Sequence, residues 1–74
     1  MKTDYPHLVF LPVRNYRHRW QVVQKRTSCI AGTVDFFFGR LAYTQTSSAV
    51  LSLEDLGEIS EFIKAADKER MAGG

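Results

Sequence analysis

The chain has 74 residues and a net charge of +2, and 45% of its residues are hydrophobic. A chain of this length holds one modest core, so residues 1–74 are expected to form a single small domain, which excludes Rossmann folds, barrels and two-lobed enzymes. The one cysteine, Cys29, excludes an internal disulfide or a cysteine zinc site and is typical of a reducing, cytoplasmic setting. We expect no signal peptide and no membrane span.

Charge is distributed unevenly along the sequence. Residues 1–34 carry six basic side chains against one acid, whereas residues 35–74 carry four basic side chains against seven acids. A basic half is typical of a surface that meets nucleic acid or an acidic protein. In the acidic half, four carboxylates are expected to lie on a solvated helix face and not to form an acid–base pair: Glu54, Asp55, Glu58 and Glu61.

The first part of the chain predicts a sheet over about residues 7–45. Residues 7–13 form a short apolar run in which Pro12 favours a sheet edge, and residues 19–26 alternate in the manner of a strand. Residues 33–43 are expected to form the third strand. A bulge at Gly39 and Arg40 would keep Leu41 and Tyr43 on the apolar face of that strand.

The last part of the chain predicts a helix over about residues 53–71. Ser52 fits the N-cap and Asp55 the third helical position of a capping box, and glycines 73 and 74 are expected to stop the helix. An apolar stripe follows helical spacing and comprises Leu53, Leu56, Ile59, Phe62, Ile63 and Ala66. The expected fold class is therefore α+β, with a three-stranded antiparallel sheet and one C-terminal helix packed on one face (β-β-β-α).

One helix covers only one face of such a sheet. The covered face is expected to hold Leu8, Phe10, Trp20, Val22, Val34, Phe36, Phe38, Leu41 and Tyr43, and the opposite face Val9, Leu11, Val13, Val23 and Phe37. An open apolar sheet face is usually covered, which predicts a homodimer or a larger protein partner at this second face. The alternative is that residues 1–6 fold back over it.

A basic, aromatic hairpin between the first two strands is the second candidate site. Its residues are Arg14, Tyr16, Arg17, His18, Arg19, Lys25 and Arg26. Arginine suits phosphates and guanine edges, and aromatic rings stack on unpaired bases, so the hairpin could meet nucleic acid or an acidic protein. The alternative is that the arginines only keep an edge strand soluble. In the order of its elements the chain resembles the DNA-binding domains of integrases and plant AP2-type transcription factors.

The sequence predicts no catalytic residue, metal site, cofactor or small-molecule substrate. His7 and His18 each lack a second ligand at metal-site spacing, and neither a phosphate-binding lysine loop nor a dinucleotide-binding glycine motif is present. Cys29 could act as a nucleophile only if His18 reached it; otherwise we expect a small buried hydrophobic residue.

These patterns predict a non-enzymatic protein-interaction module that blocks a partner by covering its surface. In size and type the chain resembles the small inhibitor proteins of phages and other mobile elements, including anti-CRISPR proteins. Arginines and exposed aromatics are frequent binding hot spots, so the expected anchors are Arg14, Arg17, Arg19 and Phe37. The alternative is a small DNA- or RNA-binding protein that uses the hairpin over residues 14–26.

Overall fold

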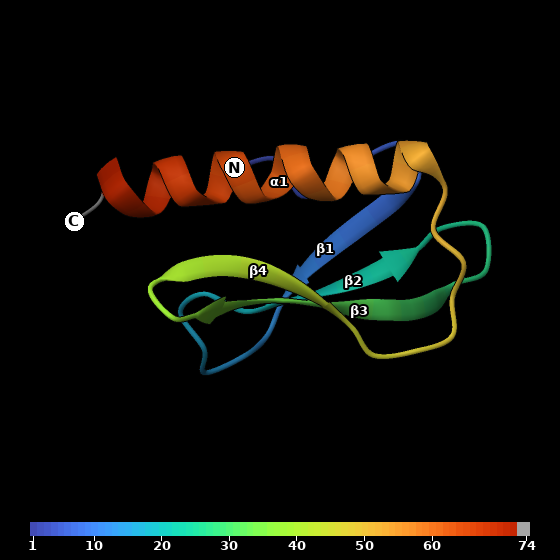
Figure 1. The fold of residues 1–74 in the computed structure, drawn as a ribbon, viewed down its shortest axis with the longest axis horizontal. Helices are drawn as coiled ribbons and strands as arrows, with labels where there is room; N and C mark the ends of the chain where they lie inside the picture. The colour runs from blue at the N-terminus through green and yellow to red at the C-terminus, as the bar shows by residue number, and fades with distance from the viewer. Residues whose placement is uncertain (73–74) are drawn as a thin grey trace.

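The fold is a four-stranded antiparallel sheet followed by one helix, which confirms the α+β class (Figure 1). The computed structural model describes residues 1–72, so the two glycines expected to stop the helix lie outside the described residues. In chain order the elements are β1 (Leu8–Pro12), β2 (Trp20–Gln24), β3 (Cys29–Phe37), β4 (Arg40–Gln45) and α1 (Leu53–Ala72). Among the described residues, no helix is both long and apolar enough to cross a membrane.

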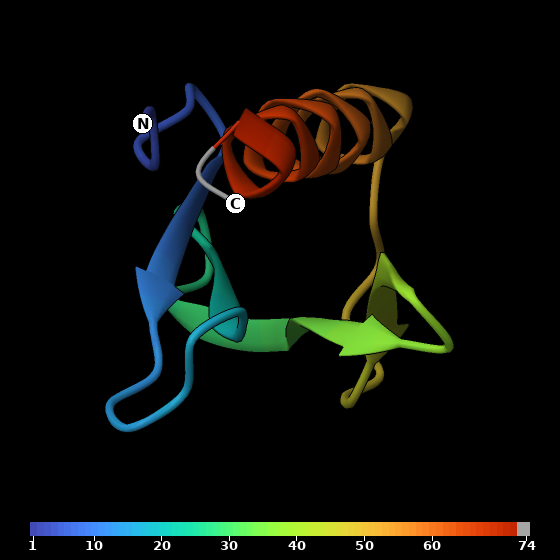
Figure 2. The same cartoon turned by 90° about the vertical axis from the view of Figure 1, so that its left-hand side faces the viewer.

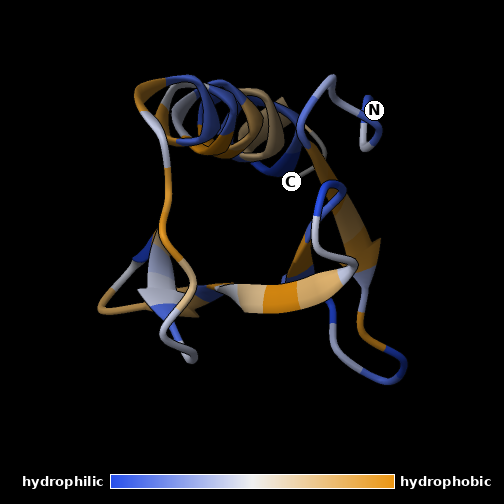
Figure 3. Cartoon of the chain, turned by 90° about the vertical axis from the view of Figure 1, so that its right-hand side faces the viewer, coloured by the Kyte–Doolittle hydropathy of each residue, from blue (hydrophilic) through white to orange (hydrophobic). Residues whose placement is uncertain are grey.

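The sheet curls around the helix. Seen end-on, β1 and β4 lie on opposite sides of β3, and α1 crosses the open side between them (Figure 2). Hydrophobic colouring falls on β1, on β3, on the connection that leads into α1 and on parts of α1 (Figure 3). The buried cluster between the two layers comprises Tyr5, Leu8, Phe10, Trp20, Val22, Val34, Leu41, Ile59, Phe62 and Ala66.

Aromatic rings form the centre of this core. The Phe10 and Phe62 rings stack with their centroids 4.0 Å apart, which joins β1 directly to α1. Trp20 packs edge-on against Phe62 at 5.1 Å, and Tyr5 packs edge-on against Phe10 at 5.3 Å. Such aromatic pairs add about 0.5–1.5 kcal/mol each beyond the area that they bury.

The N-terminal segment folds back, but toward the helix and not over the open face of the sheet. The backbone N–H of Tyr5 donates to the carbonyl of Leu8, and that of Phe10 donates to the carbonyl of Thr3, both at 2.9 Å. These bonds place Tyr5 inside the core, where it is 2% exposed. The expected alternative, a fold-back that covers the second sheet face, is therefore wrong.

A fourth strand replaces the bulge predicted at Gly39 and Arg40. Phe37 pairs with Arg40, so Phe38 and Gly39 form a two-residue turn with φ angles of 49° and 84°. Two successive positive φ angles are the mark of a type I′ hairpin turn, whose twist matches that of the flanking strands. The segment expected to be one bulged strand is thus the antiparallel pair β3 and β4.

The bulge of this sheet lies elsewhere, in β3. Val22 pairs with Gly32 but Val23 pairs with Ile30, which leaves Ala31 as the extra residue. Gly32, the residue after the bulge, has no room for a side chain, because a Cβ there would overlap the carbonyl oxygen of Thr44. The shift in pairing puts Ile30 on the same sheet face as Val23, a placement that strict alternation does not predict.

The predicted start of the helix is confirmed. The backbone N–H of Asp55 donates to Ser52 Oγ at 3.1 Å, and the N–H of Ser52 donates to Asp55 Oδ2 at 3.0 Å. This reciprocal pair is a capping box with aspartate in place of the usual glutamate. It satisfies two backbone donors that a free helix end leaves unpaired.

The helix buries a different face from the one that the apolar stripe predicted. Leu53 is 82% exposed and Leu56 is 49% exposed, whereas Asp55 and Glu58 are buried. The expectation that these two acids lie on a solvated face is therefore wrong. Each carboxylate accepts hydrogen bonds from β1, β2 or the helix cap, and such bonds offset the cost of burying the charge. Residues 59, 62 and 66 complete the buried face as predicted.

Candidate binding surface

Two of the sheet's three turns lie at the same end of the molecule. In an antiparallel meander the first and third connections are neighbours, and the last turns of α1 reach this same end (Figure 1). The His18 ring lies 6.1 Å from the ring of Phe36, and the Arg70 guanidinium lies 5.0 Å from that ring. We call this end the tip surface, and its members are Arg14, Tyr16, Arg17, His18, Arg19, Phe36, Phe37, Phe38, Arg40 and Arg70.

Arg19, one of the predicted anchors, links the β1–β2 connection to β3. Its Nε donates to Asp35 Oδ2 at 2.7 Å, and its guanidinium lies 4.1 Å from the Tyr16 ring centre. The hydrogen bond to Asp35 raises the pKa of Arg19. Burial works to raise the pKa of Asp35, but hydrogen bonds from Arg19 and from the backbone of Phe36 hold that pKa below its ordinary value. Both groups therefore stay charged at neutral pH.

Three other arginines give the tip surface its available positive charge. Arg14, Arg17 and Arg40 are exposed, and none of them forms an ion pair within residues 1–72. Arg14 and Arg17 come from the predicted hairpin, whereas Arg40 is the first residue of β4. Unpaired guanidinium groups keep all five of their N–H donors for carboxylate or phosphate.

Phe38 is the most exposed large apolar side chain of this surface. It is 103% exposed at the first position of the β3–β4 turn, while Phe36 and Phe37 are each 42% exposed. A bulky residue at positive φ is uncommon and costs of the order of 1 kcal/mol. Phe38, expected in the core, lies outside it because it belongs to the turn and not to a strand. Phe36, also expected in the core, pairs with Leu41 within β3, but it lies near the end of that strand and stays 42% exposed.

The other two basic residues of the predicted hairpin lie at the opposite end of the sheet. Lys25 Nζ is 2.5 Å from Asp4 Oδ1, and Arg26 donates to the carbonyl of Val50 at 3.0 Å. Five residues of strand, about 17 Å, separate these side chains from the tip surface. In addition, β2 pairs with both β1 and β3. Residues 14–26 are therefore not one continuous basic ribbon.

The outer sheet face, which the helix does not cover, carries an apolar row at its centre. The register aligns Val9, Val23 and Ile30 across three strands, and Leu11 lies on the same face beside Gln21 and Thr33. Leu11 and Ile30 are about 45% exposed, and Val13 is half-buried just beyond β1. Phe37 shares this face but lies toward the tip, beyond Asp35. The five residues predicted for this face thus include one that belongs to the tip surface.

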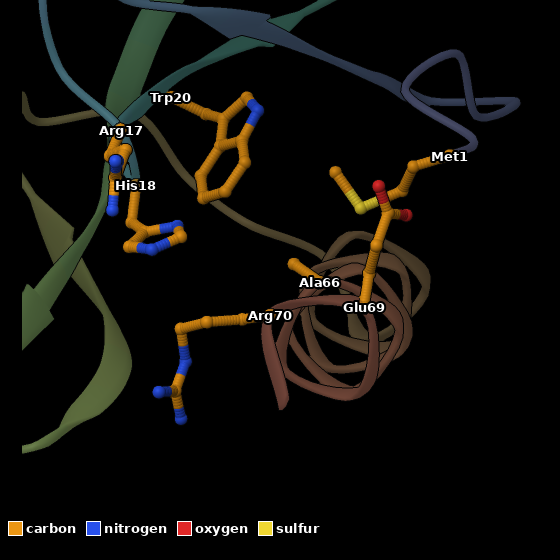
Figure 4. A pocket seen from close by; sticks show the side chains of 7 residues that line it. All are labelled: Met1, Arg17, His18, Trp20, Ala66, Glu69 and Arg70. Atoms are coloured by element: carbon orange, nitrogen blue, oxygen red, sulfur yellow. The ribbon is translucent and has the colours of Figure 1, made fainter. Parts of the chain in front are cut away.

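A hollow of about 320 Å³ opens beside the tip surface, between the β1–β2 connection and α1. Figure 4 shows Arg17, His18 and Trp20 on the sheet side, and Ala66, Glu69 and Arg70 on the helix side. Met1 completes the lining. Two bonds from Arg70 to Asp67 Oδ1, at 3.1 and 2.6 Å, hold the Arg70 guanidinium in place.

His18 and Cys29, the candidate pair for nucleophilic catalysis, lie far apart. His18 precedes the start of β2, whereas Cys29 pairs with Gln24 at the other end of that strand. Cys29 is exposed and not the buried hydrophobic residue expected from the sequence. Within residues 1–72, no three metal-ligating side chains of histidine, cysteine, aspartate or glutamate form a cluster.

Comparison with protein-family models, curated proteins and solved structures finds no match to this chain.

Sequence reasoning missed five members of these surfaces. Phe36 was expected in the core but is 42% exposed. Phe38 and Arg40 were assigned to one continuous strand, although Gly39 after an aromatic run is also a hairpin signal. Ile30 reaches the outer face only because of the bulge at Ala31. Arg70 is far from Phe36 in sequence, and only the packing of α1 brings it to the tip surface.

Proposed function

We propose that this protein is a non-enzymatic interaction module that docks a protein partner through the tip surface and blocks the partner by covering it. The observation that carries this proposal is Phe38, a wholly exposed aromatic side chain on a tight turn. Its exposure and its positive φ contribute nothing favourable to folding, so its placement is best explained by a contact made outside the chain. A two-residue turn also presents the ring with little flexibility, which limits the entropy lost on binding.

The charge around Phe38 defines the chemistry of the partner. Arg14, Arg17 and Arg40 carry unpaired positive charge at the same end of the molecule. The complementary surface is an apolar pocket for the phenyl ring with carboxylates around it. A second copy of this chain does not meet that description at its own tip, because two arginine-rich surfaces repel each other. The favoured occupant is therefore an acidic protein of a different sequence.

The test compares two exposed apolar residues at opposite ends of the molecule. Phe38→Ser removes the proposed anchor, and Leu53→Ser removes a similarly exposed side chain at the start of α1. Partners captured by the parent protein are identified, purified and titrated against each variant. We expect Phe38→Ser to weaken binding about 30-fold or more, as loss of a hot spot does, and Leu53→Ser to leave it unchanged.

A nucleic-acid partner is the outcome that would overturn this proposal. In that case capture is lost on nuclease treatment, and purified protein binds oligonucleotides through Phe38: Phe38→Ser lowers their affinity, and the log–log salt slope is about −0.9 per neutralised phosphate of duplex DNA. Equal binding by the parent, Phe38→Ser and Leu53→Ser proteins would also overturn it. Arg17→Glu provides a further check, because charge reversal should weaken an acidic partner strongly whereas Lys64→Glu, on an exposed helix position, should not.

The homodimer expected from the sequence stays a prediction. The surface available for it is the apolar row of Val9, Val23 and Ile30 with Leu11 at its side. Light scattering of the purified protein measures the mass directly, and Val23→Lys should lower that mass to a monomer if the row pairs two copies. Docking through the tip surface does not depend on the result.

A further inference from the structure

The hollow between the β1–β2 connection and α1 has the size and the wall chemistry of a small ligand site. Its volume of about 320 Å³ lies at the lower end of the range for ligand pockets, about 300–1,000 Å³. Ala66 lies on its helix wall, where a methyl group leaves space that a larger side chain would occupy. A guest of this size is limited to one ring system with a charged group attached.

Two planar side chains, on the sheet side and the helix side of the hollow, favour a planar ligand. The His18 ring lies on the sheet side, at 6.5 Å from the Trp20 ring, and the Arg70 guanidinium lies on the helix side (Figure 4). Asp67 and the Phe36 ring fix the position of Arg70, so its plane needs no reordering when a ligand enters. Guanidinium and imidazole groups both stack on aromatic rings.

The charged groups of the lining suit a ligand that carries both an anionic group and an amino group. Arg17 lines the hollow, is exposed and forms no ion pair among residues 1–72, so it is available to an anion. Glu69 is the acidic side chain of the lining, and a carboxylate accepts hydrogen bonds from an amino group. A flat ring that bears an amino group and is linked to a phosphate has this pattern of donor and anion.

We propose that this hollow binds a nucleotide whose base carries an exocyclic amino group, with the base between His18 and Arg70, its amino group at Glu69 and its phosphate at Arg17. The guest is either a free mononucleotide or an unpaired nucleotide at the end of a strand. The hollow shares Arg17, His18 and Arg70 with the tip surface, but Phe38, the proposed partner anchor, does not line it.

The tryptophan in the wall makes the test direct, because Trp20 is the only one in the chain and its emission reports on the hollow. Titration with AMP should give a saturable change in emission by about 10 mM, enough to detect a Kd near 1 mM. IMP, which lacks the amino group, and adenosine, which lacks the phosphate, should each bind about tenfold more weakly. A hexamer of adenylate that binds more tightly than AMP identifies a strand as the source, and equal affinity identifies the free nucleotide.

Matched variants assign the two polar contacts. Arg17→Ala should lower affinity for AMP about tenfold, whereas Arg14→Ala, on the same connection but outside the hollow, should not. Glu69→Gln should abolish the preference for AMP over IMP, whereas Glu61→Gln should keep it. Phe38→Ser should leave AMP binding intact, which separates this site from partner docking.

The proposal is overturned if no nucleotide changes Trp20 emission, or if Arg17→Ala and Arg14→Ala bind AMP equally. Circular dichroism establishes that each variant is folded. NMR of the parent protein provides a measurement that needs no variant: addition of AMP should shift the Trp20 indole and His18 ring signals before those of Cys29, which lies at the other end of the sheet.

Discussion

Glu58 and His7 join the helix to the first strand. Glu58 Oε2 lies 2.6 Å from Nδ1 of the His7 ring, and its two oxygens also accept the backbone N–H groups of His7 and Leu8 at 3.0–3.2 Å. These contacts span 50 or more residues of sequence. A buried helix carboxylate therefore satisfies the backbone donors at the start of β1.

Glu58→Ala should be strongly destabilising, because it leaves two backbone N–H groups near the core without an acceptor. The expected loss is about 2–4 kcal/mol in the free energy of unfolding, measured by urea denaturation at pH 7. Glu61 lies about one turn after Glu58 and is exposed, so Glu61→Ala should change the free energy of unfolding by less than about 0.5 kcal/mol. Equal midpoints for the two variants would contradict this role.

The same pair predicts a loss of stability on the alkaline side. The hydrogen bond to Glu58 raises the pKa of His7 above its ordinary value and outweighs the opposing effect of desolvation. The stabilisation is therefore fully present below the unfolded pKa of about 6.5 and is lost as pH rises through the higher folded pKa. NMR titration of the His7 ring gives the pKa directly. In His7→Ala the unfolding midpoint should no longer fall across that pH range.

The helix cap should contribute a measurable share of stability. Ser52→Ala removes the hydroxyl that accepts the N–H of Asp55, and we expect a loss of about 1 kcal/mol. Ser60→Ala, at an exposed position inside the helix, should be neutral or slightly stabilising because alanine is the better helix former. Thermal unfolding of the two variants makes the comparison. A cap that contributes nothing would give equal melting temperatures.

Asp55 predicts a loss of stability in acid. Burial works to raise the pKa of Asp55, but hydrogen bonds from Ser52 and Gln24 and the nearby charge of Arg26 bring that pKa below its ordinary value. The stabilisation is present above the unfolded pKa of about 3.9 and is lost as pH falls through the folded pKa. Asp55→Asn should flatten the acid limb of the stability curve measured between about pH 5 and pH 2.

Phe38→Asn should stabilise the fold while it removes partner binding. Asparagine before glycine is the preferred pair in a type I′ turn, and the phenyl ring makes no buried contact to lose. We expect a gain of about 0.5–1 kcal/mol in the free energy of unfolding. Phe37→Asn, within β3, should lower it instead. A less stable Phe38→Asn protein would show that the ring supports the fold.

Two glycines should respond to alanine in opposite directions. A Cβ at Gly32 would collide with the backbone of Thr44 and the ring of Tyr43, so Gly32→Ala should destabilise by about 3 kcal/mol or more. Gly57 lies within α1 with open space at its Cβ position, so Gly57→Ala should stabilise by about 1 kcal/mol. Denaturation midpoints that move in the same direction would contradict the close approach at Gly32.

Local signals in the sequence were reliable where neighbouring residues decide the structure. The helix and its capping box follow from the spacing of Ser52, Asp55 and the residues after them. The first strand follows from its apolar run, and the second follows from alternation. The prediction of one bulged strand through Gly39 was wrong, because a two-residue turn and a one-residue bulge differ only in which segments pair. That choice depends on residues far apart in the chain.

The sequence by itself determined the α+β class, the helix with its cap, and the basic aromatic connection at residues 14–19. Only the tertiary structure decided which face of α1 is buried, because the backbone donors of β1 and the side chain of Gln24 give Asp55 and Glu58 the partners that make their burial possible. It also decided that Arg70 meets Phe36 and that Lys25 and Arg26 lie apart from Arg17. Periodicity describes one element at a time, whereas a binding surface depends on how separate elements pack together.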